Sequence, residues 1–185
     1  MSMKKAAPMN KILFDNSGSM SELGKEQLLI NTLRFCRQFI ELNNIKEPVE
    51  YYQASNSIDQ IQFEENNDIV ILPPTGRTSG EVISDWLQSN KNNFIFWITD
   101  GYTNFSEELL LNLGKKSNLV IVALGCDADI NQLKRFQSSL FLVDNLDAAL
   151  EKFFTPISNM SVLPKVVEEA ATENVFSDDD NDDEW

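Results

Sequence analysis

The sequence predicts an α/β fold with a doubly wound, mostly parallel central sheet that is flanked by helices and has one short antiparallel edge strand. Short apolar runs alternate with longer stretches of helical period from residue 11 to residue 154, which is typical of strands joined by crossover helices. The chain has 185 residues, enough for one domain and too few for two ordinary ones. We therefore expect one domain over residues 10–155, an N-terminal extension over 1–9 and an acidic, disordered tail over 156–185.

The first expected elements are a buried strand and a long crossover helix. Residues 11–15 (KILFD) form an apolar run that ends in small polar residues at 16–19. A helix is expected from about residue 22 to residue 42, and Pro48 ends the crossover. Four apolar residues recur on one face of this helix: Leu29, Leu33, Cys36 and Ile40.

The rest of the domain continues the same alternation, which requires parallel strands and right-handed crossovers. Strands are expected over 49–54, 58–63 (the antiparallel edge), 68–72, 93–98, 118–124 and 139–143, and helices over 81–88, 106–115, 129–137 and 146–154. Residues 93–98 (NFIFWI) are too few for a helix and rich in aromatic side chains, which favours a buried central strand. Trp86 and Trp97 are expected in the core, and Ser106 is suited to cap the helix that follows it.

Composition and charge exclude several functional classes. The absence of histidine removes the commonest general base and the usual zinc ligand. Cys36 and Cys126 supply no disulfide framework, and both are expected to be buried as small apolar residues. Much of the net charge of −14 lies in residues 166–185, which excludes nucleic acid and anionic lipid as partners. No apolar run approaches the roughly 18 residues of a membrane span, and residues 1–10 lack the pattern of an export signal, so we expect a cytoplasmic protein.

Carboxylates and hydroxyls lie at the ends of three of the expected elements. Asp15, Ser17 and Ser19 come after the first strand, Thr78 precedes the helix over 81–88, and Asp100 follows the aromatic strand. Ligands of doubly wound sheets bind at the carboxyl ends of the strands, so these five side chains are candidate ligands of one metal ion. Hard oxygen donors, with two carboxylates among them, suit Mg²⁺, with Mn²⁺ as the alternative. The competing interpretation is ordinary turn and cap chemistry in a site that holds no metal.

Three motifs in this order resemble the metal-ion-dependent adhesion site (MIDAS) of the von Willebrand factor A (vWA) family, a Rossmann-like fold. They are Asp15-x-Ser17-x-Ser19, the Gly-x-Thr that ends at Thr78, and Ile-Thr-Asp-Gly around Asp100. The resemblance implies that Ser17 and Ser19 bind the metal directly and that Thr78 binds it directly or through water. It also implies that the two aspartates mainly accept hydrogen bonds from the bound waters and hydroxyls, and that a partner protein supplies an Asp or Glu to the metal.

Two departures and one longer stretch refine this resemblance. Asn16 and Arg77 replace glycines that are usual in the family, and Arg77 adds a positive charge at the rim for an incoming carboxylate. Residues 122–133 resemble stand-alone bacterial vWA proteins, which work beside AAA+ ATPases of the MoxR type or in tellurite-resistance and stress operons. We therefore expect a non-catalytic adaptor or regulator of a multiprotein assembly.

Two other functions compete with this expectation. One is a structural assembly subunit whose metal site stays empty. The other is a phosphotransferase similar to the haloacid dehalogenases, which would need an acid where Ser17 stands and a lysine beside the site, neither of which the sequence indicates. Asp127 and Asp129 are interpreted as caps of the helix over 129–137.

The acidic tail is a candidate ligand peptide. Asp178–Glu184 is almost entirely acidic and lies between Phe176 and Trp185, two aromatic residues suited to anchor it in a groove. The final helix is expected to end at the side of the sheet opposite the metal, so the tail would reach the site of a neighbouring copy more easily than its own. The alternatives are docking on a basic surface without metal and a purely solubilising role.

Overall fold

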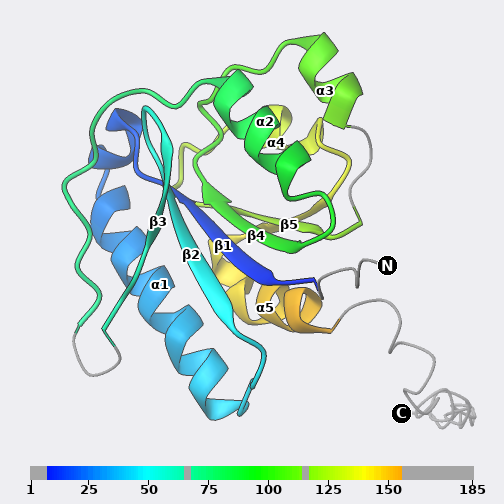
Figure 1. The fold of residues 1–185 in the computed structure, drawn as a ribbon. Coiled ribbons are helices and arrows are strands. Elements are labelled where there is room, and N and C mark those ends of the chain that lie inside the picture. Colours follow the sequence, from blue (N-terminus) through cyan, green and yellow to red (C-terminus); the bar gives the residue numbers. More distant parts are fainter. Residues whose placement is uncertain (1–7, 65–67, 114–116, 156–185) are drawn as a thin grey trace, which may run out of the picture.

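A computed structural model of the chain describes residues 8–64, 68–113 and 117–155 (Figure 1). The central sheet has six strands in the order β3-β2-β1-β4-β5-β6, and every neighbouring pair is parallel except β2 and β3. This arrangement confirms the predicted fold class. Most of the predicted N-terminal extension and the whole predicted tail lie outside the described residues.

The observed elements follow the predicted order. The strands are β1 (Asn10–Asp15), β2 (Val49–Ala54), β3 (Ile58–Ile61), β4 (Phe94–Thr99), β5 (Leu119–Ala123) and β6 (Ser139–Leu142). The α-helices are α1 (Lys25–Leu42), α2 (Gly80–Ser89), α3 (Glu107–Leu113), α4 (Ile130–Lys134) and α5 (Leu146–Phe154), with short 3₁₀-helices at η1 (Gly18–Ser21) and η2 (Val143–Asn145).

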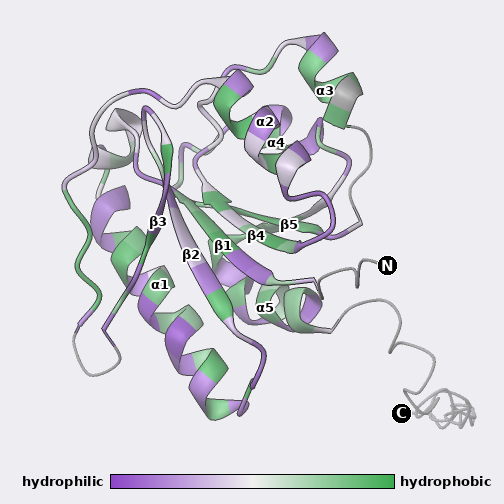
Figure 2. Ribbon diagram, viewed as in Figure 1, coloured by the Kyte–Doolittle hydropathy of each residue, from purple (hydrophilic) through white to green (hydrophobic). Residues whose placement is uncertain are grey.

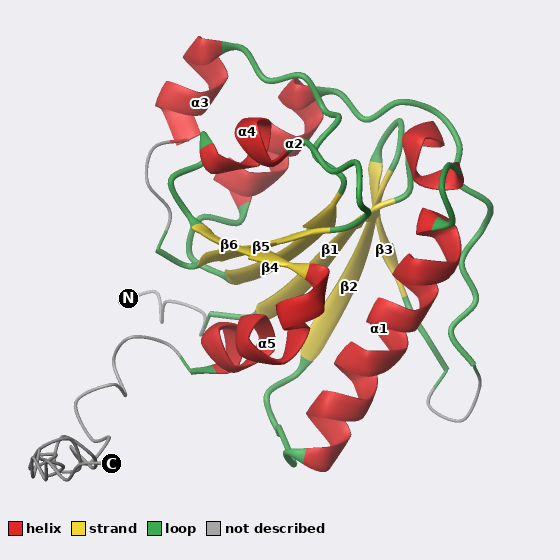
Figure 3. Ribbon diagram, turned by 180° about the vertical axis from the view of Figure 1, so that it is seen from behind, coloured by secondary structure: helices red, strands yellow, loops and turns green. Residues whose placement is uncertain are grey.

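Two apolar cores cover the two faces of the sheet, because successive strand residues point to opposite sides. Ile12 and Phe14 of β1 face α1 and α5, whereas Leu13 between them faces the layer of α2, α3 and α4 (Figures 1 and 3). Hydrophobic and hydrophilic residues alternate along the helices (Figure 2), and the apolar residues of α1 and α5 in the first core include Leu29, Leu33 and Leu150. Trp97 lies in the second core with 1% exposure, and Trp86 packs against its edge.

Two expectations about the elements and one about a cysteine were wrong. Residues 68–72 form no strand: Ile69 and Ile71 pack into the core on the α1 side, and Asp68 pairs with Arg34 of α1. The helix predicted from residue 22 begins at Lys25, because the chain first forms η1. Cys126 is exposed, whereas Cys36 is buried as predicted.

The order of the strands fixes where a ligand can bind. The chain leaves β1 toward β2 on one side, whereas β4 pairs with β1 on the other, so the order of strands reverses at β1. Loops that leave the carboxyl ends of β1 and β4 therefore diverge and leave room between them. Asp15 ends β1, and Asp100 directly follows β4.

Candidate functional site

The loop after β1 turns two hydroxyls toward each other beside a buried carboxylate. Asp15 is 2% exposed and accepts hydrogen bonds on both oxygens, from the Ser17 backbone N–H at 2.9 Å and from Thr99 Oγ1 at 2.9 Å. Ser17 Oγ and Ser19 Oγ lie 3.2 Å apart. The 3₁₀ turn of η1 produces this approach, because it tightens the chain directly after Ser17.

A second loop, which leads to Thr78, is joined to the first by backbone hydrogen bonds. Gly18 N–H donates to the Gly76 carbonyl at 3.0 Å, and Thr75 N–H donates to the Asn16 carbonyl at 3.0 Å. Gly76 has a φ of +75° and a side chain there would meet the Asn56 amide, so the turn requires glycine. Asn16 fixes the loop further by donating to the Leu72 carbonyl at 3.1 Å, a role that the usual glycine would not fill.

Thr78 carries the observation that bears most directly on metal binding. Its side chain is 4% exposed, and Oγ1 has no hydrogen-bond partner among the described residues. A buried hydroxyl without a partner is costly, and such groups are rare unless they have a functional role. The hydroxyls of Ser17 and Ser19, the carboxylates and this orphaned oxygen together form a set of hard donors that fits Mg²⁺ or Mn²⁺.

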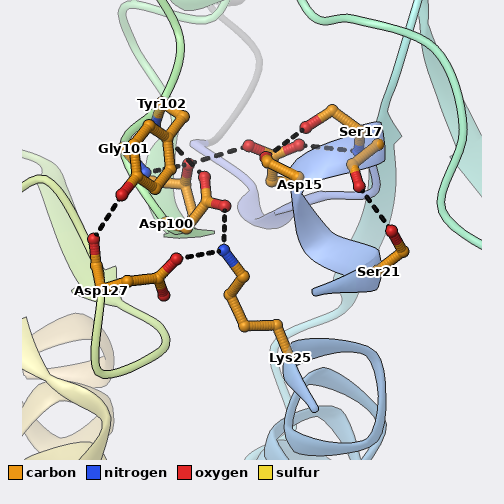
Figure 4. A network of polar contacts seen from close by, with 11 residues as sticks. Asp15, Ser17, Ser21, Lys25, Asp100, Gly101, Tyr102 and Asp127 are labelled. Atoms are coloured by element: carbon orange, nitrogen blue, oxygen red, sulfur yellow. Dashed lines mark hydrogen bonds and ion pairs between the residues drawn. The ribbon is translucent and has the colours of Figure 1, made fainter. Parts of the chain in front are cut away.

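Lys25 is the part of the site that the sequence analysis missed. Its ammonium donates to Asp100 Oδ2 and to Asp127 Oδ2, each at 2.9 Å, and the side chain is 1% exposed (Figure 4). The signal was present, because Lys25 precedes Leu29 by four residues and so lies in the buried stripe of α1. A lysine in such a stripe needs a paired acid.

The electrostatics of this cluster follow from burial and pairing. Burial raises the pKa of the Asp15 carboxyl above its ordinary value, against the opposing hydrogen bond from Ser17. Burial lowers the pKa of Lys25, but its hydrogen bonds to Asp127 and Asp100 outweigh that effect and leave the pKa raised. The hydrogen bond from Lys25 holds the pKa of Asp127 below its ordinary value. Lys25 is therefore an ammonium and Asp127 a carboxylate at neutral pH.

The structure corrects one of the two cap assignments. Asp129 caps α4 as predicted, since its side chain accepts from the Gln132 backbone N–H at 2.9 Å. Asp127 is an ion-pair partner of Lys25 instead. The sequence also indicated no lysine beside the site, and this was wrong: Lys25 reaches Asp100 from α1, a helix distant from Asp100 in sequence.

The loops that carry the predicted site residues therefore lie at one edge of the sheet, although the set is not a cluster of acids. No group of three or more Cys, Asp or Glu side chains within residues 8–64, 68–113 and 117–155 is arranged to hold a metal. With two carboxylates and three hydroxyls, the set leaves positions for water and for a partner's ligand. Arg77 is exposed beside Thr78, where an approaching anion would meet it.

Comparison with known proteins places the fold. No protein-family model matches the chain, and no curated protein matches its sequence significantly. Among solved structures, the SpRpn10 VWA domain matches with a TM-score of 0.53 and 16% identity, over 80% of this chain and 95% of that one. Manganese-loaded TRAP protein from Plasmodium vivax matches with a TM-score of 0.57 and 15% identity, over 81% and 74% of the two chains.

A third similar structure is that of a zinc-bound protein. It is proximal thread matrix protein 1 from the mussel byssus with a zinc-occupied MIDAS motif, which matches with a TM-score of 0.50 and 11% identity, over 82% of this chain and 48% of that one. Identities this low establish the fold alone, and the chain has the vWA, Rossmann-like fold. None of the described helices is long and apolar enough to cross a membrane.

Proposed function

We propose that the protein is a non-catalytic, Mg²⁺-dependent protein-interaction module, with Mn²⁺ as the alternative ion. Thr78 carries the proposal, because its buried Oγ1 has no hydrogen-bond partner among the described residues and its loop is joined by backbone hydrogen bonds to the loop that carries the paired hydroxyls of Ser17 and Ser19. Those three oxygens would hold the ion, and Asp15 and Asp100 would orient its waters. An Asp or Glu of a partner protein would complete the coordination.

The similar structures support a divalent ion at this edge. The TRAP protein is described as manganese-loaded and the byssus protein as zinc-occupied, so domains of this fold hold divalent ions. The present chain has no histidine and offers only oxygen donors at the site, which favours Mg²⁺ or Mn²⁺ over zinc.

A cytoplasmic adaptor role is the finer part of the proposal. The resemblance of residues 122–133 to stand-alone bacterial vWA proteins supports a MoxR-type AAA+ ATPase or another stress assembly as the partner. Arg77 at the rim favours an acidic contact residue on that partner. A pull-down with Mg²⁺ and with EDTA tests this role: we expect retention of a AAA+ ATPase only with Mg²⁺.

The environment of Asp15 favours the interaction module over the phosphotransferase alternative, even though Lys25 lies nearby. A nucleophilic carboxylate needs an open oxygen that can approach phosphorus. Both oxygens of Asp15 accept hydrogen bonds, and only 2% of the residue is exposed. A generic phosphatase assay, with Asp15→Asn as the control, is expected to show no activity above that control.

A structural subunit with an unused site is the second candidate, and Lys25 favours it because the ammonium already neutralises part of the acidic charge. The two functions are distinguished by thermal denaturation with EDTA, Mg²⁺ or Mn²⁺. We expect either metal to raise the wild-type melting temperature, because a ligand that binds only the folded state stabilises it. Ser17→Ala and Ser19→Ala should lose this rise and keep their circular dichroism spectra. A wild-type melting temperature indifferent to both metals would refute the metal-dependent module.

A further inference from the structure

The side chain of Lys25 lies between two separate segments of the chain, one after β4 and one after β5. Its ammonium lies between Asp100 after β4 and Asp127 after β5, and 5.2 Å from the centroid of the Tyr102 ring (Figure 4). The stem packs so tightly on Gly125 that a side chain at that position would lie 2.8 Å from Lys25 Cδ.

These two segments are themselves fixed by hydrogen bonds. Tyr102 OH donates to the Asp127 carbonyl at 2.9 Å, and the backbone N–H of Tyr102 donates to Asp100 Oδ1 at 3.2 Å. Asp129 N–H donates to the Asp100 carbonyl at 2.8 Å. The ammonium is therefore held in one place, on one oxygen of a candidate metal-site carboxylate.

The charges around this edge are unequal. Asp15, Asp100 and Asp127 are three carboxylates, and Lys25 is the cation that pairs with two of them, which leaves a local charge of −2. A divalent ion would balance that charge. Without Lys25 the fully buried Asp100 would have no cationic partner among the described residues of the metal-free protein, an arrangement that strongly destabilises folded chains.

We propose that Lys25 is a permanent counter-ion of the metal site, which keeps the site folded without a divalent ion and lowers its affinity for that ion. This inference rests on the proposed metal-dependent function. Lys25 does not touch the ion in this arrangement: it acts through Asp100, by holding one oxygen and by repelling a second cation. Because the positive charge of Lys25 weakens metal binding, the bound metal exchanges readily with metal in solution. Partner binding therefore depends on the concentration of free Mg²⁺.

A series of charge variants separates this role from a purely structural one. The local charge is −1 in Asp127→Asn, −2 in the wild type and in the double variant Lys25→Met/Asp127→Asn, and −3 in Lys25→Met. Calorimetric titration of the full chain with Mg²⁺ or Mn²⁺ alone should follow this order. We expect Asp127→Asn to bind about tenfold more weakly than the wild type and Lys25→Met about tenfold more tightly, with the double variant near the wild type.

Thermal denaturation supplies a second readout. In EDTA, Lys25→Met should have the lowest melting temperature of the four proteins, and metal should restore most of the loss. Lys11→Met is the matched control: Lys11 is also buried and paired, with Glu50 at 2.7 Å, but it lies at the other end of β1. This control should lose stability with and without metal and keep the wild-type affinity.

Each outcome decides between the two roles. Lys25→Met with wild-type or weaker affinity, or Asp127→Asn with wild-type affinity, would overturn the proposal. If Lys25→Met folds only with metal, the proposal gains support; if it folds under neither condition, the comparison of Asp127→Asn with the wild type decides. If the wild type binds neither ion, the proposed function fails. The proposed role of Lys25 would then be supported only if Lys25→Met binds metal, and it would be overturned otherwise.

Discussion

Replacing Thr78 by valine tests the site, because the substitution should stabilise the metal-free protein and destabilise the metal-bound one. Valine has nearly the same shape as threonine and the same branching at Cβ, so the substitution removes the hydroxyl and little else. In the metal-free protein this hydroxyl is buried and has no partner among the described residues. Its removal should therefore stabilise the metal-free fold, whereas the same change should cost the metal-bound protein a ligand.

The two effects have comparable magnitudes. A buried hydroxyl left without a hydrogen bond costs about 1–3 kcal/mol, and about 1 kcal/mol shifts the melting temperature of a domain of this size by roughly 2–4 °C. Thr78→Val should thus melt a few degrees above the wild type in EDTA. Metal at 100 times its dissociation constant stabilises a folded protein by about 2.7 kcal/mol, and the variant should lose most of that gain. Where the orphaned hydroxyl costs about 1 kcal/mol, the lost metal stabilisation is the larger effect, so the order of the two melting temperatures should reverse in Mg²⁺.

Differential scanning calorimetry in EDTA and in Mg²⁺ measures both effects, and Thr32→Val is the matched control. Thr32 is equally buried, but its hydroxyl donates to the Leu28 carbonyl at 2.8 Å in α1. That variant should be no more stable than the wild type in EDTA and should keep the full metal response. A Thr78→Val protein that is destabilised in EDTA, or that responds to Mg²⁺ like the wild type, would refute the reasoning.

Three further measurements test other parts of the molecule. Thiol labelling of the native chain should modify Cys126 quickly and Cys36 only on unfolding, because burial raises the pKa of Cys36 to about 12; rapid reaction of both thiols would contradict this. The hydrogen bond from Lys11 holds the pKa of Glu50 below its ordinary value of 4.5, so the pair stabilises the fold above that pH and loses its effect as pH falls through the lower folded pKa. The excess stability of the wild type over Glu50→Gln, measured by urea denaturation, should therefore be constant above about pH 5 and shrink below pH 4. Truncation after Lys165 should abolish any Mg²⁺-dependent self-association in light scattering, and association that survives truncation would exclude the tail as the ligand peptide.

The sequence was sufficient for features that depend on local patterns. The aromatic run at β4 and the apolar stripe of α1 led directly to buried elements, because burial on both faces of a parallel sheet leaves a continuous apolar run. Residues 68–72 are also mostly apolar, yet a strand needs a neighbouring strand to pair with. Ile69 and Ile71 pack into the core on the side of α1 instead. Which segment packs against which depends on the tertiary structure, and a local sequence pattern does not determine it.

At the site, too, the sequence predicted what depends on local motifs and missed what depends on contacts between distant residues. The motif spacing placed Asp15 and Asp100 at one edge, but the ion pair of Asp100 with Lys25 joins residues 75 positions apart. Two neighbouring carboxylates alone would repel, so Asp100→Ala would be expected to stabilise the metal-free protein, whereas removing a buried partner of Lys25 should destabilise it.

The position of α5 has a practical consequence for binding experiments. Phe154, at the end of α5, stacks on Phe39 near the end of α1, with ring centroids 6.1 Å apart, while Lys25 at the start of α1 lies at the metal edge (Figure 1). The described chain therefore ends at the pole opposite the site. A protein anchored to a sensor chip near Phe154 would present Ser17, Thr78 and Arg77 to the solution, whereas an anchor in the loops after β1 or β4 would obstruct them.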